Sequence, residues 1–217
     1  MKIFVDFDDV IFNAKRFKND FIRVFARNGI TRSEFENSYY TFQKKAQMEG
    51  RYYDPKKQVE VLRRRNRIDH EKLARDIDAF MSDLEKYVFR DVSNFLGNFK
   101  KKDLYLISYG HVKHQKAKIK GSGVRKYFKK VVISKDRKIN IIKEVIRKDN
   151  FSPNESVILI DDRPEQLERA EKERKSVVTF HMCRPEGRYS DLICTAMDYE
   201  VKNLKEAAGI IKKEGMK

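Results

Sequence analysis

Apolar positions divide this chain into one stretch with a helical period and a second stretch in which strand-like and helical segments alternate. After the short apolar run KIFVDF at the N-terminus, apolar residues recur every three to four positions, as they do along an amphipathic helix. Phe17, Phe21, Val24 and Phe25 carry this pattern, and Asn28-Gly29 ends it. The sequence therefore predicts a helix directly after the first strand.

Further helix signals follow in this first stretch. A capping box at residues 31–34 opens a second amphipathic helix that we expect to end at Gly50. Asp54-Pro55 supplies an N-cap and a proline at the first helical position, and Asp69 caps another apolar-periodic segment. Residues 13–92 are therefore expected to form an all-helical insertion of about four helices.

The pattern changes after this insertion. Apolar runs rich in β-branched residues alternate with helical segments such as KINIIKEVIRK. These runs are DLYLIS (103–108), VVIS (131–134), SVILIDD (156–162) and SVVTFHM (176–182). The alternation predicts an α/β fold with a doubly wound parallel sheet, built from residues 1–12 and 93–217, and with residues 13–92 as a separate helical domain.

Polar and acidic side chains stand where several predicted strands end: Asp6, Asp8, Ser108, Asp161 and Asp162. Parallel strands place their carboxyl ends on one edge of the sheet, where α/β proteins bind ligands. Four carboxylates at that edge would repel one another, and a divalent cation removes the conflict. Because only oxygen ligands are offered, the pattern favours a hard ion such as Mg²⁺ over zinc.

Two lysines follow the third of these strands. Lys138 begins an apolar-periodic helix, whereas Lys135 lies in the preceding loop. We expect Lys138 to balance the negative charge and Lys135 to be solvated. Asp9 is given no chemical role, and we expect it to face away or to cap the turn.

Four short motifs in order resemble those of the haloacid dehalogenase (HAD) superfamily. VDFDDV resembles the first motif, LYLIS ending at Ser108 the second, Lys138 after VVISKDR the third, and VILIDD the fourth. The stretch KAKIKGSGVRKYFKKVVIS resembles the segment between the second and third motifs of phosphoglycolate-phosphatase-like members. The helical insertion stands where that subfamily carries its helical cap. The resemblance implies a Rossmann-like HAD core.

The resemblance also implies roles for individual residues. Asp6 would attack phosphorus to form an aspartyl-phosphate, and Asp8 would act first as general acid and then as general base. Ser108, Tyr109 and Lys138 would bind the substrate phosphate. The presence of Asp8 argues against a dehalogenase, because dehalogenases of this superfamily lack that acid.

The metal ligands implied by the resemblance are Asp6 and Asp8 of the first motif and Asp161 and Asp162 of the fourth. Mg²⁺ would be held by the Asp6 side chain, the Asp8 carbonyl and Asp161, with Asp162 in an outer position. The expected activity is a Mg²⁺-dependent phosphatase acting on a small phosphate monoester. Three alternatives stay open: a sugar phosphomutase, a polynucleotide phosphatase, and a non-catalytic basic binding protein on a HAD scaffold.

The charge of the chain bears on the last two alternatives. The net charge is +16, from 49 Lys and Arg against 33 Asp and Glu. Residues 13–92 carry 19 basic and 13 acidic side chains, so the excess is spread over both parts of the chain. Such a diffuse excess favours a solvated, lysine-rich surface and a small phosphorylated metabolite as partner. Nucleic acid is possible but not favoured.

Other features bear on location and assembly. No apolar run approaches the length of a membrane-spanning helix, so no membrane partner is expected. Acidic residues interrupt the N-terminal apolar run where a signal peptide would continue. Cys183 and Cys194 show no CxxC or Cys/His spacing typical of metal sites, and we expect reduced thiols in a cytoplasmic protein. The oligomeric state is left open.

Two groups of side chains could extend the site. Tyr40, Arg51, Tyr52 and Tyr53 of the insertion could contact the leaving group of a substrate, although ordinary packing is the simpler interpretation. His111 and His114 follow Ser108 closely, but their spacing of three and the lack of a third ligand favour a solvated first helical turn over a metal site.

Overall fold

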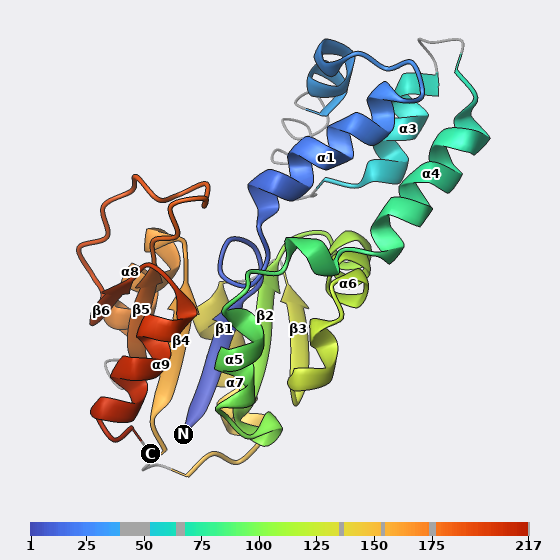
Figure 1. Ribbon diagram of the computed structural model, residues 1–217. Coiled ribbons are helices and arrows are strands. Elements are labelled where there is room, and N and C mark those ends of the chain that lie inside the picture. The colour runs from blue at the N-terminus through green and yellow to red at the C-terminus, as the bar shows by residue number, and fades with distance from the viewer. Residues whose placement is uncertain (40–52, 64–67, 135–136, 153–154, 174–176, 217) are drawn as a thin grey trace.

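The computed structural model describes residues 1–39, 53–63, 68–134, 137–152, 155–173 and 177–216. In these residues one parallel sheet has the strand order β3-β2-β1-β4-β5-β6 (Figure 1). Its strands are β1 (Lys2–Asp6), β2 (Leu104–Tyr109), β3 (Lys130–Ser134), β4 (Val157–Asp161), β5 (Val177–Met182) and β6 (Tyr199–Val201). The predicted parallel sheet is confirmed, and β6 is a short edge strand that the sequence pattern did not predict.

Helices cover both faces of this sheet, as a doubly wound fold requires. One face packs against α5 (Val92–Gly97), α6 (Val112–Gly121) and α9 (Leu204–Lys213). The other face packs against α7 (Lys138–Lys148) and α8 (Pro164–Glu173). Because both faces are covered, β4 and the part of β1 after Lys2 are apolar until each strand ends in an aspartate.

The described part of the helical insertion contains only helices. They are α1 (Ala14–Ala26), a helix through residues 32–39, α3 (Pro55–Arg63) and α4 (His70–Ser82), followed by a short 3-10 turn at Glu85–Tyr87. The capping box is present, because the Thr31 N–H donates to Glu34 Oε2 at 2.8 Å and the Glu34 N–H to Thr31 Oγ1 at 3.2 Å. The predicted helix end at Gly50 lies outside the described residues.

The insertion leaves the core and rejoins it at adjacent points. The Asn13 N–H donates to the Tyr87 carbonyl at 2.8 Å, and the Phe89 N–H donates to the Ile11 carbonyl at 3.0 Å. The two connecting segments therefore lie side by side, next to the carboxyl end of β1. Figure 1 shows α1, α3 and α4 beyond the ends of the strands.

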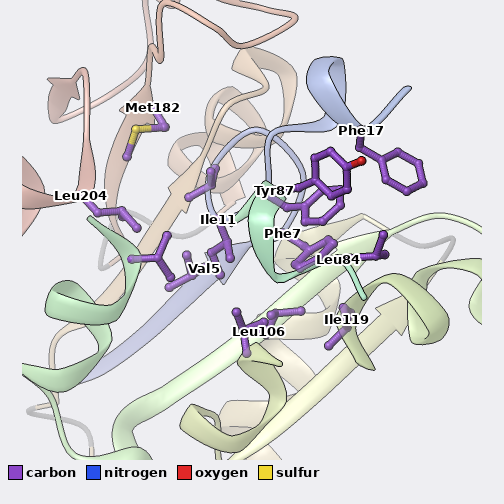
Figure 2. Close-up of a cluster of buried hydrophobic side chains, with 14 of the residues drawn as sticks. Val5, Phe7, Ile11, Phe17, Leu84, Tyr87, Leu106, Ile119, Met182 and Leu204 are labelled. Atoms are coloured by element: carbon purple, nitrogen blue, oxygen red, sulfur yellow. The ribbon is translucent and has the colours of Figure 1, made fainter. Parts of the chain in front are cut away.

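A continuous set of buried side chains joins the insertion to the core. Figure 2 shows the set extending from Val5 and Leu106 on the sheet, through Phe7, to Phe17 and Tyr87. The rings of Phe17 and Tyr87 meet edge to face with centroids 5.7 Å apart. Apolar contact of this kind fixes the base of the insertion against the sheet edge that carries Asp6 and Asp8.

Of the helices in the described ranges, none combines the length and the apolar character needed to cross a bilayer.

Candidate active site

Two aspartates at neighbouring strand ends share one lysine. Asp6 ends β1 and Asp161 ends β4, and the two strands are paired. Lys138, the first residue of α7, donates from Nζ to Asp6 Oδ1 at 2.6 Å and to Asp161 Oδ2 at 2.5 Å. All three side chains are buried. Lys138 thus occupies the position between the carboxylates, whereas Lys135 lies outside the described residues.

The burial of this group changes how it titrates. Burial raises the pKa of Asp6 to about 7, with the charges of Asp161 and Asp8 acting in the same direction, although the Lys138 ammonium opposes them. Burial alone would lower the pKa of Lys138, but the two carboxylates raise it above its ordinary value. Lys138 is therefore charged at neutral pH, and Asp6 is poised between its two protonation states.

Asp162 adds a third carboxylate to this group. Its Oδ2 atom is buried and has no hydrogen-bond partner. Burial, and then the charges of Asp6 and Asp161, raise the pKa of Asp162 well above its ordinary value. Each of these three aspartates offers an oxygen within 4.8 Å of the others. The unpartnered oxygen of Asp162 and the closely spaced carboxylates of all three aspartates are the ligands that a divalent cation such as Mg²⁺ takes.

Asp8 occupies a different electrostatic environment. Its Oδ1 accepts from the Lys118 ammonium, and its Oδ2 accepts from Gln115 Nε2 at 2.9 Å. Burial would raise the pKa of Asp8, but Lys118, Arg188 and the Gln115 hydrogen bond lower it to about 2. Asp8 is therefore ionised at neutral pH.

Gln115 also connects Asp8 to the end of β2. Its Nε2 atom donates to Ser108 Oγ at 2.8 Å, and Ser108 is buried. Tyr109 follows Ser108 and is half-buried, with the Arg163 guanidinium 5.6 Å from the centre of its ring. The end of β2 thus presents a hydroxyl and an aromatic ring beside Asp8.

Asp9 holds two segments together behind the site. It is fully buried and has a φ of 58°. Its Oδ1 accepts from the Ala14 N–H at 3.1 Å, and its Oδ2 accepts from the Arg188 guanidinium. Asp9 therefore binds the first N–H of α1, whose N-cap is Asn13, and also anchors the loop that carries Arg188.

A cavity of about 540 Å³ opens over these groups. The predicted site residues on its wall are Asp6, Asp8, Ser108, Tyr109, Lys138 and Asp162. Asp161 lies beneath the wall, in contact with Lys138. The structure therefore brings the predicted strand-end residues together at one edge of the sheet.

Sequence reasoning missed several residues that surround this cavity: Gln115, Lys118, Arg163, Arg188 and Tyr189. Gln115 and Lys118 contact Asp8 across more than one hundred positions of sequence, so no local spacing identifies them. One signal was available, since both residues share the buried face of α6 with Ile119. A buried polar side chain on an apolar helix face calls for a partner.

His111 and His114 lie at the start of a helix, as predicted, but the expectation that they are solvated was wrong. Both side chains are half-buried, and His114 lies on the cavity wall with its ring edge-to-face against Tyr53 at a centroid distance of 5.4 Å. Burial, followed by the charge of Lys118, lowers the pKa of His114 to about 3. His114 is therefore a neutral imidazole, and it belongs to neither group of possible metal ligands in the described residues.

The insertion contributes aromatic side chains to the cavity. Phe17, Phe21, Phe35, Tyr39 and Tyr53 border the cavity. The three phenylalanines are buried, so Tyr39 and Tyr53 present most of the accessible aromatic surface. Tyr53 packs against Tyr39 with centroids 4.5 Å apart and also faces the cavity. The other insertion residues considered for substrate contact, Tyr40, Arg51 and Tyr52, lie outside the described residues.

A family comparison agrees with this geometry. The family model that describes haloacid dehalogenase-like hydrolases matches residues 3–179 of the sequence. This range includes all four motifs. The chain belongs to the haloacid dehalogenase-like hydrolases. No protein with a curated description matches the sequence.

Solved structures of haloacid dehalogenase-like hydrolases share the fold of the whole chain. One from Burkholderia xenovorans is 16% identical, with 97% of this chain and 96% of that chain covered and a TM-score of 0.73. YfnB from Bacillus subtilis, described as bound to magnesium, is 18% identical, with 97% of each chain covered and a TM-score of 0.61. The L-2-haloacid dehalogenase of Xanthobacter autotrophicus is 13% identical, with 97% and 98% covered and a TM-score of 0.63. At these identities the likeness establishes the fold.

Proposed function

We propose that this hydrolase is a Mg²⁺-dependent phosphatase that acts on a small phosphate monoester through an aspartyl-phosphate. The observation that carries the proposal is the pair Asp6 and Asp8, which face the same cavity in opposite electrostatic environments. In the metal-free protein these environments are the reverse of what catalysis needs, because Asp6 has the higher pKa and Asp8 the lower. The proposal therefore requires a bound cation to lower the pKa of Asp6 and the substrate to raise that of Asp8.

The metal in this proposal would be held by oxygen atoms of Asp6 and Asp161, with Asp162 nearby. The unpartnered Oδ2 of Asp162 and the oxygens gathered within 4.8 Å support this assignment. When bound, Mg²⁺ would supply positive charge that lets a phosphate dianion approach the ionised Asp6. Lys138 holds the two carboxylates in place and neutralises part of their charge.

The reaction divides into two displacements at phosphorus. In the first, an Asp6 oxygen bonds to phosphorus while the bond from phosphorus to the leaving oxygen breaks, and Asp8 gives that oxygen its proton. In the second, water bonds to phosphorus and passes a proton to Asp8, and the bond to Asp6 breaks. Ser108 and Lys138 would bind phosphoryl oxygens, and inorganic phosphate and an alcohol are the products.

Asp8 must gain a proton before the first displacement. Its pKa of about 2 depends on Lys118 and Arg188. A bound phosphate dianion adds negative charge beside Asp8 and competes for the same cations, so both effects raise the pKa of Asp8. Substrate binding therefore prepares the acid form of Asp8.

The part of the cavity that the insertion forms indicates what the leaving group carries. The half-buried rings of Tyr39 and Tyr53 border it, together with the neutral His114 ring. Flat rings pack well on aromatic side chains. We therefore favour a phosphate ester with a flat ring in its leaving group, such as a nucleoside monophosphate. The helical insertion would act as the cap that closes over it.

A phosphate-ester panel tests this proposal. Purified protein with Mg²⁺ is given nucleoside monophosphates, sugar phosphates, glycerol phosphate and a 5′-phosphorylated oligonucleotide, and released phosphate is measured. We expect the ring-bearing esters to have the highest kcat/KM and Asp8→Asn to abolish turnover. Halide release from a 2-haloacid, with no phosphate release from any ester, would instead assign the protein as a dehalogenase.

A further inference from the structure

A second group of possible metal ligands lies at the edge of the sheet. His181 is on β5 and pairs in register with Glu200 on the edge strand β6. Cys183 follows β5, and its N–H donates to the Val201 carbonyl at 2.8 Å. Side chains two positions apart point to the same face of a strand, so His181 and Cys183 share a face. The three donors meet although the sequence shows no Cys/His spacing that predicts a metal site.

The three donor groups lie close together. Cys183 Sγ lies 3.1 Å from His181 Nδ1 and 3.7 Å from Nε2, and Glu200 Oε2 lies 3.8 Å from Nδ1. Each of the three residues offers a ligand atom within 4.8 Å of the others. His181 is fully buried and its ring is thereby fixed, whereas the Glu200 side chain is 50% exposed. The site is thus rigid on the side of β5 and open to solvent on the side of β6.

We propose that His181, Cys183 and Glu200 bind Zn²⁺, with the fourth coordination position open to water. One thiolate, one imidazole and one carboxylate suit a borderline ion such as Zn²⁺, whereas the oxygen-only group at Asp6 suits Mg²⁺. With Zn–S near 2.3 Å and Zn–N near 2.1 Å, tetrahedral coordination places sulfur and nitrogen ~3.6 Å apart. Because Sγ now lies near both ring nitrogens, a rotation of the Cys183 side chain is needed to bring it to the Nδ1 side of the ring at that spacing.

This position gives the metal a structural consequence for the active site. Cys183 begins the loop that returns to the sheet at β6, and the same loop carries Arg188 and Tyr189 to the cavity. A metal bound by Cys183 and Glu200 would tie the two ends of this loop together. It would also reinforce β6, which has three residues and one neighbouring strand. The Zn²⁺ site therefore supports the loop that positions Arg188 against Asp9.

A cobalt titration tests the site directly. Co²⁺ takes the place of Zn²⁺ in tetrahedral sites and gives a charge-transfer absorption band in the near ultraviolet only when a thiolate is bound. Reduced, metal-free protein is titrated with Co²⁺ and then with Zn²⁺. We expect the band to appear at one equivalent and to disappear as Zn²⁺ displaces Co²⁺. The band should be absent from Cys183→Ser, and Glu200→Gln should weaken Co²⁺ binding at least tenfold.

Two matched variants assign the band to this site. Cys194→Ser removes the other thiol of the chain and should keep the band. Asp6→Asn alters the acidic group at the cavity and should keep it as well, so a failure of the phosphatase proposal leaves this test intact. Absence of the band from the wild-type protein would overturn the proposal. Its persistence in Cys183→Ser would do the same.

Discussion

At the scale of single residues, the structure gives Asp6 and Asp8 different protonation states. Asp6 is buried beside two further carboxylates, which raises its pKa to about 7 in the metal-free protein. Asp8 is held by cations and has a pKa of about 2. The pKa of each aspartate depends on the charged residues beside it, so substituting one of these residues should raise or lower that pKa.

Asp6→Asn should abolish turnover and stabilise the metal-free protein at high pH. An unfolded aspartate loses its proton near pH 4, whereas folded Asp6 keeps it up to about pH 7. The free energy of unfolding therefore falls as the pH rises through this window, and asparagine removes that loss. We expect at least a roughly 10⁴-fold lower kcat.

Thermal unfolding in EDTA measures the second effect. The Tm of Asp6→Asn should exceed that of the wild type by on the order of 5 °C at pH 8, and the difference should shrink at pH 5. Asp78→Asn, on the exposed face of α4, is the matched control and should show no such dependence. A Tm difference that does not change with pH would contradict the assignment of the titration to Asp6.

Lys118→Met should raise the pKa of Asp8. Lys118 binds Asp8 Oδ1, and its ammonium lies 5.0 Å from the centre of the Phe12 ring, so methionine fills its place among apolar groups. Loss of the cation favours the protonated acid. The limb of the pH profile of kcat/KM that reports Asp8 should move to higher pH by at least about one unit, a tenfold change in proton affinity. The control is Lys120→Met on the exposed side of α6. If both variants gave the same pH profile of kcat/KM, Lys118 would not be the residue that lowers the pKa of Asp8.

At the scale of elements, what the sequence predicts depends on whether the signal is local. Strands β1 to β5 and the capping box carry periodicity or composition within a few residues, and the structure confirms them. β6 has three residues and the sequence YEV, which is too short for a period to show. Lys118 and Arg188 reach Asp8 and Asp9 from distant segments, and only the packing of α6 and of the loop after β5 brings them there.

One contact between elements gives a further prediction. Gly121 ends α6 beside the end of α4, and the Leu84 N–H donates to its carbonyl at 2.9 Å. A Cβ at this position would overlap the Met81 carbonyl oxygen, which belongs to the backbone and cannot move away easily. Gly121→Ala should therefore destabilise the protein by about 1–3 kcal/mol in denaturant unfolding.

Gly209→Ala is the matched control for this substitution. Gly209 lies within α9, and a Cβ there would meet nothing within 4 Å. Alanine should stabilise that helix by roughly 0.5–1 kcal/mol, since glycine costs about that much in a helix interior. Equal effects of the two substitutions would show that α6 and α4 do not depend on this close approach.

At the scale of the whole molecule, the insertion and the core meet around the cavity. The Tyr53 ring contacts His114 of α6, and Asp54 Oδ2 lies 3.9 Å from His111 Nε2. The insertion therefore contributes both the aromatic wall and contacts to the rim formed by α6. A cavity of about 540 Å³ has room for a small ester, and the distribution of charge leads to the same expectation.

The salt dependence of substrate binding separates a small ester from a nucleic acid. The charge of +16 is spread over both parts of the chain. A protein that neutralises several phosphates along a strand loses affinity by about 10³-fold or more between 50 and 200 mM salt. A phosphate held by the buried groups Ser108 and Lys138 is poorly screened. We expect KM for the best small ester to rise less than about tenfold over this range.

Fluorescence anisotropy with labelled single-stranded and duplex oligonucleotides completes this comparison. The same protein preparation is titrated at both salt concentrations, beside the KM measurements, so that the two salt dependences share one set of conditions. We expect weak binding that does not saturate at physiological salt. The sequence predicts no long basic helix and no basic stripe interleaved with aromatic residues. Submicromolar binding that falls steeply with salt would contradict the small-ester proposal. A 3′- or 5′-phosphorylated polynucleotide would then be the substrate to test first, with the positive charge of the molecule as part of its binding surface.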